Sequence, residues 1–317
     1  MRILALIVAL LSVVSSPAAW GESPPYQAGV GLVQGTADAP IDAMVRYPTL
    51  EVERTTTPNS NPQPPAAAPA PAEGRFPVVL LSHGGGTTGG SPRSLGGLSV
   101  ALARQGFIVV APFHGITPLQ RRTGQVVRAL DAALADRRFA SHMDPARLGM
   151  LGFSLGGAVT LELAGARPDG LHFLAYCETH PDDFMSCDQT PGGRKSERGE
   201  RPADPPRLPL KAIVLLDPLA ALFQRDGLTA VTMPVLLVRP AQSQLSGEGN
   251  AFALATALPR APQFSMVPGD HFILTDVCLP QPRSEAEPVC QDPSGVDRAA
   301  VQAEVAARIA KFFQDHL

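Results

Sequence analysis

The 317-residue sequence is poor in aromatic residues and in net charge, and each shortage argues against a class of function. With one tryptophan and three tyrosines, it has few rings on which a carbohydrate could stack. A formal net charge of −3 gives no indication that the partner is nucleic acid or an acidic membrane surface. No internal repeat is present. The length and the 44% of hydrophobic residues suit one large globular domain, or two small ones, with a substantial core, and we expect a single domain over residues 22–317.

The first 21 residues have the three parts of a secretory signal peptide. Arg2 supplies a positive start, residues 3–14 are apolar, and small residues follow at 15–19. The apolar run is too short to span a membrane comfortably, and no later run approaches that length. We therefore expect cleavage between about Ala18 and Gly21 and a mature protein that is periplasmic or secreted.

Four cysteines follow this segment, at Cys177, Cys187, Cys278 and Cys290. Export to an oxidising compartment predicts disulfides, and four cysteines allow three pairings. The pairing we expect, Cys177 with Cys187 and Cys278 with Cys290, closes the shortest loops. Neither pair has C-x-x-C spacing and no histidine cluster accompanies them, so we expect no metal site.

Apolar strands alternate with helical patterns along most of the chain. Buried strands are predicted at 76–82, 107–111, 148–153, 211–216 and 234–239, and a last strand at 263–267. Helices are predicted at 95–105, 123–139, 157–163, 250–258 and 296–313. An alternating segment at 41–47 predicts an antiparallel, half-exposed strand. Together these elements predict an α/β fold with a mostly parallel central sheet and helices on both faces.

Two segments interrupt this alternation. Residues 58–74 contain too many prolines for a helix or a central strand and predict an extended surface loop. Residues 170–209 are polar and contain the first cysteine pair, and we expect them to form a loop insert near the active site.

The candidate nucleophile lies in Gly152-Phe153-Ser154-Leu155-Gly156, between a predicted strand and a predicted helix. A G-x-S-x-G sequence in this context is typical of a nucleophile elbow. There the serine lies on a strained turn, and glycines avoid collisions with neighbouring backbone. The helix N-terminus directs free N–H groups and its positive dipole end at the same place. The alternative is a tight strand–helix turn with a solvated serine.

An activated serine needs a base and an acid that orients the base. His271 follows the last predicted strand, and loops there lie at the same edge of a parallel sheet as Ser154. We therefore expect His271 to be the base. Asp217 directly follows strand 211–216 and is the first candidate for the acid. Glu248, in the loop after the next strand, is the alternative because that loop contains no aspartate.

The glycine-rich loop after strand 76–82 is expected to complete an oxyanion hole. The N–H of Leu155 is one predicted donor and that of Gly85 the other, while Gly84 and Gly86 let the backbone approach a substrate closely. His83 is expected to hold this loop by hydrogen bonding. The loop does not match G-x-x-x-x-G-K-[ST], so it is not a phosphate-binding loop of that kind.

These residues resemble the bacterial predicted dienelactone hydrolase group of α/β-hydrolases, which is related to platelet-activating-factor acetylhydrolase. The resemblance extends over nearly all of the mature chain and rests on short segments: RYP at 46–48, LSHGGG at 81–86, GFIVVAP at 106–112, DPARLGMLGFSLGG at 144–157, LLDP at 215–218, DHF at 270–272 and the cysteine segment 278–290. In that group the order is Ser…Asp…His and the acid follows the LLDP strand, which supports Asp217. Dienelactone hydrolases proper use a cysteine nucleophile. The serine at position 154 therefore implies hydrolysis of simple esters.

The sequence thus predicts an exported serine esterase that needs no cofactor and acts on small or medium-chain esters. One alternative is a lipase-like or polyester hydrolase with the same triad. Another is an inactive binding module on the same scaffold, because fold alone does not determine activity. The sequence makes no prediction of the oligomeric state.

Overall fold

The computed structural model describes residues 25–51, 68–85, 90–187, 206–276 and 288–317. The expected signal peptide at 1–21, Gly86, Cys278 and most of the proline-rich loop lie outside these ranges. The strands are β1 (Gln27–Thr36), β2 (Ala39–Thr49), β3 (Phe76–Ser82), β4 (Ile108–Pro112), β5 (Met143–Phe153), β6 (Ala212–Leu216), β7 (Val235–Pro240) and β8 (Gln263–Val267). The α-helices are α1 (Gly96–Arg104), α2 (Leu119–Ala135), α3 (Leu155–Leu163), α4 (Gly170–Thr179), α5 (Phe184–Cys187), α6 (Ala251–Ala257) and α7 (Arg298–His316).

All eight strands form one sheet in the order β1-β2-β4-β3-β5-β6-β7-β8. From β4 to β8 every neighbouring pair is parallel, whereas β1 and β2 are antiparallel to each other and β2 is antiparallel to β4. This confirms the mostly parallel sheet predicted from the alternation of strands and helices. The carboxyl ends of β3 and β5 to β8 consequently meet at one edge.

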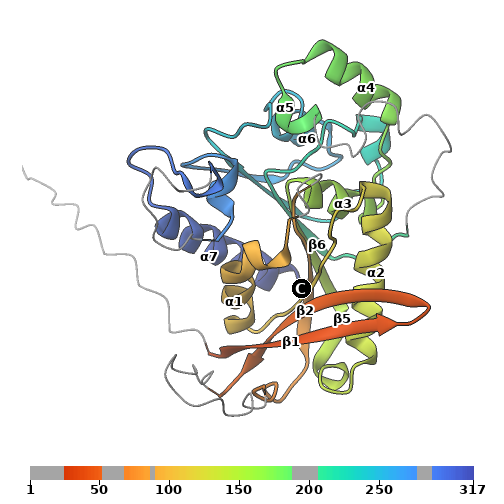
Figure 1. Cartoon of the computed structure of the whole chain (residues 1–317), viewed down its shortest axis with the longest axis vertical. Helices are drawn as coiled ribbons and strands as arrows, with labels where there is room; N and C mark the ends of the chain where they lie inside the picture. Colours follow the sequence, from red (N-terminus) through yellow and green to blue (C-terminus); the bar gives the residue numbers. More distant parts are fainter. Residues whose placement is uncertain (1–24, 52–67, 86–89, 188–205, 277–287) are drawn as a thin grey trace, which may run out of the picture.

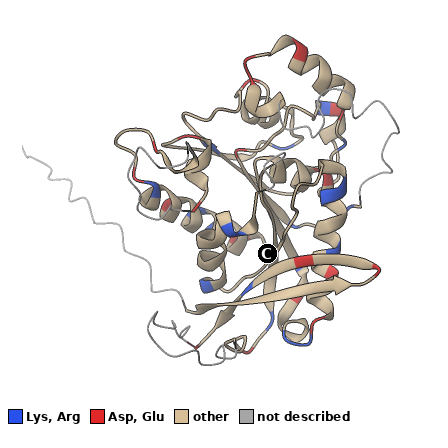
Figure 2. Cartoon of the chain, viewed as in Figure 1, with Lys and Arg blue, Asp and Glu red and all other residues tan. Residues whose placement is uncertain are grey.

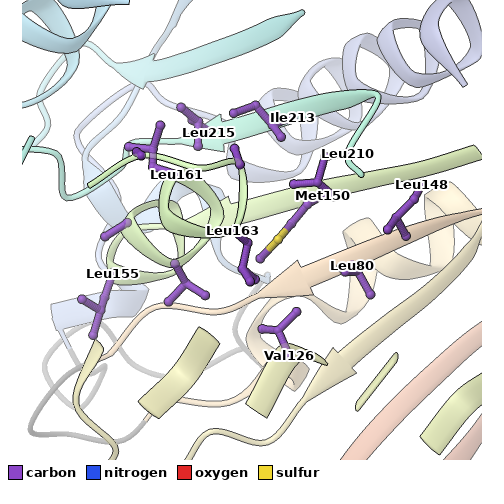
Figure 3. Close-up of a cluster of buried hydrophobic side chains, with 14 of the residues drawn as sticks. Leu80, Val126, Leu148, Met150, Leu155, Leu161, Leu163, Leu210, Ile213 and Leu215 are labelled. Atoms are coloured by element: carbon purple, nitrogen blue, oxygen red, sulfur yellow. The ribbon is translucent and has the colours of Figure 1, made fainter. Parts of the chain in front are cut away.

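Helices cover both faces of the sheet. Successive strand residues point to opposite sides, so alternate side chains of one strand pack against different helices. Val78 and Leu80 belong to the core shared with α2 and α3, whereas Val79 and Leu81 belong to the core shared with α1 and α7. Figure 1 shows these helix pairs on opposite sides of the sheet, and Figure 3 shows aliphatic side chains of the first core. In Figure 2 charged residues are concentrated on helices and loops. Burial of each large aliphatic side chain contributes about 1.5–3 kcal/mol to folding.

Strand β1 was missed by the sequence prediction because glycine replaces the apolar residues that normally mark one face of a strand. A Cβ atom on Gly29 would overlap the ring of Tyr47, and one on Gly31 would lie 2.7 Å from the ring of Phe139. These two aromatic rings fill the space that β1 side chains would otherwise occupy. β2 is also more buried than predicted, because α1 and α2 both pack against it and its side chains enter both cores of the sheet.

Helix α2 and strand β5 differ most from their predicted bounds. Helix α2 spans Leu119–Ala135 rather than 123–139; Pro118 at its N-cap and the extended conformation of Asp136 set the two ends. Strand β5 begins at Met143 rather than at residue 148. The β3–β5 ladder has an irregularity between Pro77 and Val78.

The insert at 170–209 is not simply a loop excursion, because its first part is helical. The Asp169 side chain accepts a hydrogen bond from the N–H of His172 and caps α4. The predicted Cys177–Cys187 disulfide is confirmed, with a Cα–Cα distance of 5.6 Å, and it joins α4 to α5. Cys290 is also disulfide-bonded. None of the helices described is long and apolar enough to cross a bilayer.

Candidate active site

Ser154 occupies a sharp turn between β5 and α3. Its φ of 55° lies in a region that side chains other than glycine rarely adopt, at a typical cost of about 1–3 kcal/mol. A Cβ on Gly152 would overlap the backbone of Gly156, and one on Gly156 would overlap the carbonyl of Ser82. Both glycines are therefore required, since they let the start of α3 pack closely against the ends of β5 and β3.

His271 and Asp217 are held together by a buried hydrogen bond at the same edge of the sheet. His271 Nδ1 lies 2.7 Å from Asp217 Oδ2, and the two side chains are 2% and 0% exposed. A carboxylate only accepts hydrogen bonds, so Nδ1 carries the proton and Nε2 is left as an acceptor. Asp217 directly follows β6 and has a φ of 40°. His271 begins the short 3-10 helix η5 (His271–Leu274) after β8.

Backbone and ring contacts place Ser154 beside this pair. The N–H of Ser154 donates to the carbonyl of Leu216 at 3.0 Å, immediately before Asp217. The imidazole of His271 stacks on the ring of Phe153, immediately before Ser154, with centroids 4.7 Å apart. Ser154 is 4% exposed, and its side chain does not cap α3. The structure thus places Ser154 at the same edge of the sheet as the His271–Asp217 pair, through contacts of its own N–H and of the neighbouring Phe153.

Two further residues contact Asp217 that the sequence interpretation did not identify. The Ser243 hydroxyl donates to Asp217 Oδ2, and Arg239 Nη1 lies 3.4 Å from Oδ1. Arg239 also donates to the carbonyl of Leu245. The sequence did contain a signal for Arg239, because it lies near the end of the otherwise apolar strand β7. A buried cation there needs an anionic or carbonyl partner.

Glu248, the alternative acid, lies elsewhere. It is exposed, and one of its carboxylate oxygens accepts a hydrogen bond from the Ser246 hydroxyl at 3.4 Å. Asp217, rather than Glu248, is therefore the carboxylate that contacts His271.

The glycine loop after β3 packs directly on the elbow. A Cβ on Gly84 would lie 2.9 Å from Ser154 Cβ, and Gly85 has a φ of 82°, so both positions favour glycine. Leu155, the other predicted oxyanion donor, is the first residue of α3. As expected, His83 holds the loop: its Nδ1 donates to the carbonyl of Gly84 at 2.7 Å.

His83, at the start of this loop, is paired with a second buried histidine, His114. His83 Nε2 accepts a hydrogen bond from the N–H of His114, whose ring is bonded to Ser82 and to Gln125. Burial lowers the pKa of His83 from 6.5 to about 4 and lowers the pKa of His114 well below its usual value. Both rings are therefore neutral at neutral pH.

This pair predicts a loss of stability in mild acid. Between pH 6.5 and about 4 the unfolded chain binds a proton at His83 that the folded protein does not bind. The free energy of unfolding should therefore fall as the pH decreases through this window, by on the order of 3 kcal/mol for His83. Denaturant unfolding between pH 7.5 and 4.5 measures the slope. His83→Gln should flatten the slope, and His172→Gln, outside the network, should not. Equal slopes in all three proteins would contradict this origin.

No group of three or more histidine, cysteine or acidic side chains that could hold a metal ion occurs among the described residues. The candidate site consists of a serine, a histidine, an aspartate and backbone N–H groups. This set is suited to acyl transfer.

Comparison with known proteins supports the fold and leaves the activity open. No protein-family model matches the chain. Over 84 residues the chain is 38% identical to the cutinase est2 of Thermobifida alba, a match covering 25% of this chain and only 28% of the cutinase. The crystal structure of a dienelactone hydrolase from Anabaena variabilis is similar over 92% of this chain and 100% of its own, with a TM-score of 0.51 and 15% identity. These values show that the chain has the α/β-hydrolase fold, as the sequence resemblance implied.

Proposed function

We propose that this α/β-hydrolase-fold protein is a serine hydrolase that cleaves carboxylic esters through an acyl-enzyme intermediate. The observation that carries the proposal is the buried 2.7 Å hydrogen bond between His271 and Asp217, beside a serine on a strained turn. A tight strand–helix turn with a solvated serine would require neither the buried histidine–aspartate pair nor the glycine loop packed on Ser154.

In the proposed reaction, Ser154 Oγ attacks the ester carbonyl while His271 Nε2 takes its proton. Asp217 holds the imidazole in the required tautomer and stabilises its protonated form. The N–H groups of Leu155 and Gly85 bind the oxyanion. The imidazolium then protonates the leaving alcohol, and a water molecule, deprotonated by the same Nε2, releases the carboxylic acid and restores Ser154.

Small or medium-chain esters are the proposed substrates. The partial identity to a cutinase favours a second candidate, a lipase-like or polyester hydrolase with the same triad. The insert supports this candidate too, because it exposes two large apolar side chains, Leu171 on α4 (81%) and Phe184 on α5 (72%), and exposed apolar surface is typical of binding sites for apolar partners. We also propose that the protein is exported, which is consistent with its Cys177–Cys187 disulfide.

Fluorophosphonate labelling tests the proposal directly, since this probe reacts with activated serines. We expect the wild type to be labelled and Ser154→Ala to remain unlabelled. A series of p-nitrophenyl esters would then locate the preferred acyl length and separate the two hydrolase candidates. Absence of labelling in folded, oxidised wild type would overturn the proposal in favour of a binding module.

A further inference from the structure

Arg122 on α2 is a fully buried cation whose described hydrogen bonds all go to backbone carbonyls. Its Nε donates to Thr117 at 2.8 Å, and its two Nη atoms reach the carbonyls of His83, Gly84, Gly85 and Gly115. The side chain is 0% exposed. Burial lowers its pKa to about 10, so the guanidinium stays charged at neutral pH.

Three of these carbonyls belong to consecutive residues of the glycine loop. In a planar trans peptide the C=O and the following N–H point in opposite directions. The carbonyl of Gly84 points toward Arg122, 3.4 Å from Nη1, so the N–H of Gly85 points away from the guanidinium. The same carbonyl accepts a second hydrogen bond from His83. The peptide that contains the proposed oxyanion donor is therefore fixed in direction by two side chains.

Burying this cation is costly, because desolvation of a charged group costs several kcal/mol even when it has partners. A neutral side chain of similar size would fill the same space at a lower cost. The guanidinium does more than fill space: it aligns the dipoles of successive peptides in a loop with positive φ at Gly85. Preorganised dipoles of this kind need no reorganisation when charge develops on a bound carbonyl oxygen.

We propose that Arg122 is a positioning residue for the oxyanion hole, acting through the carbonyls of His83, Gly84 and Gly85. This inference rests on the proposed serine hydrolase function. It predicts that removing the guanidinium weakens stabilisation of the transition state more than it weakens substrate binding. A role confined to stability would lower the melting temperature without changing kcat of the folded protein.

The test compares wild type, Arg122→Met and Arg122→Lys with Arg121→Met, an exposed arginine on the same helix as matched control. For a short p-nitrophenyl ester we expect kcat of Arg122→Met to fall by about 10- to 100-fold, less than the roughly 100- to 1,000-fold cost of deleting an oxyanion donor. KM should change by less than about 3-fold. The kcat of Arg122→Lys should lie between those of wild type and Arg122→Met, because one ammonium group cannot reach all the carbonyls. Arg121→Met should match wild type.

A trifluoromethyl ketone inhibitor supplies the second readout, because its adduct with the serine carries an oxyanion. Its Ki should rise by the same factor as kcat falls, and hydrogen exchange should quicken in peptides containing Gly84 and Gly85. Unchanged kcat and Ki in folded Arg122→Met would overturn the inference. If Arg122→Met does not fold, unchanged kcat and Ki in Arg122→Lys would overturn it instead. Wild type that resists fluorophosphonate would instead overturn the proposed function, and the inference with it.

Discussion

Replacing Ser154 with alanine is expected to lower kcat by about five to six orders of magnitude, as for nucleophile deletion in other triads. Without Oγ no acyl-enzyme forms, and His271 has no hydroxyl to deprotonate. The remaining rate would come from backbone donors acting on a water molecule. The fold should be retained, since the Ser154 side chain does not cap α3 and alanine keeps the Cβ.

The measurement is kcat for a p-nitrophenyl ester, together with the thermal unfolding midpoint. Ser141→Ala, at an exposed position away from the elbow, is the control and should match wild type in both. A Ser154→Ala variant that is folded and retains more than a few per cent of wild-type turnover would eliminate Ser154 as the nucleophile.

Asp217→Asn is the second large effect, with an expected loss of about 10⁴-fold in kcat. The wild-type carboxylate accepts three donors: His271 Nδ1 and Ser243 on Oδ2, and Arg239 on Oδ1. An amide offers one acceptor oxygen, and its NH₂ would face a donor. Either His271 adopts the wrong tautomer or the Ser243 and Arg239 contacts are lost. Asparagine tolerates positive φ, so the turn itself should survive.

Glu248→Gln is the matched control, because it makes the same acid-to-amide change in a neighbouring loop. We expect its turnover to remain within about 2-fold of wild type, since an exposed carboxylate interacts weakly with a distant site. A large loss in Glu248→Gln together with an intact Asp217→Asn would reverse the assignment of the acid.

The sequence predicted the central sheet because its strands are continuous aliphatic runs that are buried on both faces, as in 76–82 and 234–239. It failed where tertiary contacts replace the local signal. β1 has no apolar alternation because Gly29 and Gly31 occupy positions on its buried face. Their lack of side chains makes room for aromatic rings from elsewhere in the chain. Helix α4 was not predicted because it lies in a segment interpreted as a polar loop, although Asp169 provided an N-cap signal for it.

For the candidate site, the sequence indicated the residues at strand ends but not those that support them. Ser154, Asp217 and His271 each follow a strand, so topology alone brings them to one edge. Arg122 and Ser243 carry no such signal: one lies within a helix and the other in a polar loop. Their contacts depend on how separate loops fold against each other. Only a three-dimensional structure reveals such contacts.

The two strained turns are joined to each other through the main chain. Besides the bond from Ser154 N–H to Leu216, the N–H of Leu219 donates to the carbonyl of Ser154 at 3.0 Å. The spacing between Ser154 and Asp217 is consequently set by backbone atoms, whose hydrogen bonds do not depend on side-chain identity. Substitutions in α4 and α5 should therefore leave the relative position of Ser154 and Asp217 unchanged, because neither helix contributes to these two backbone hydrogen bonds.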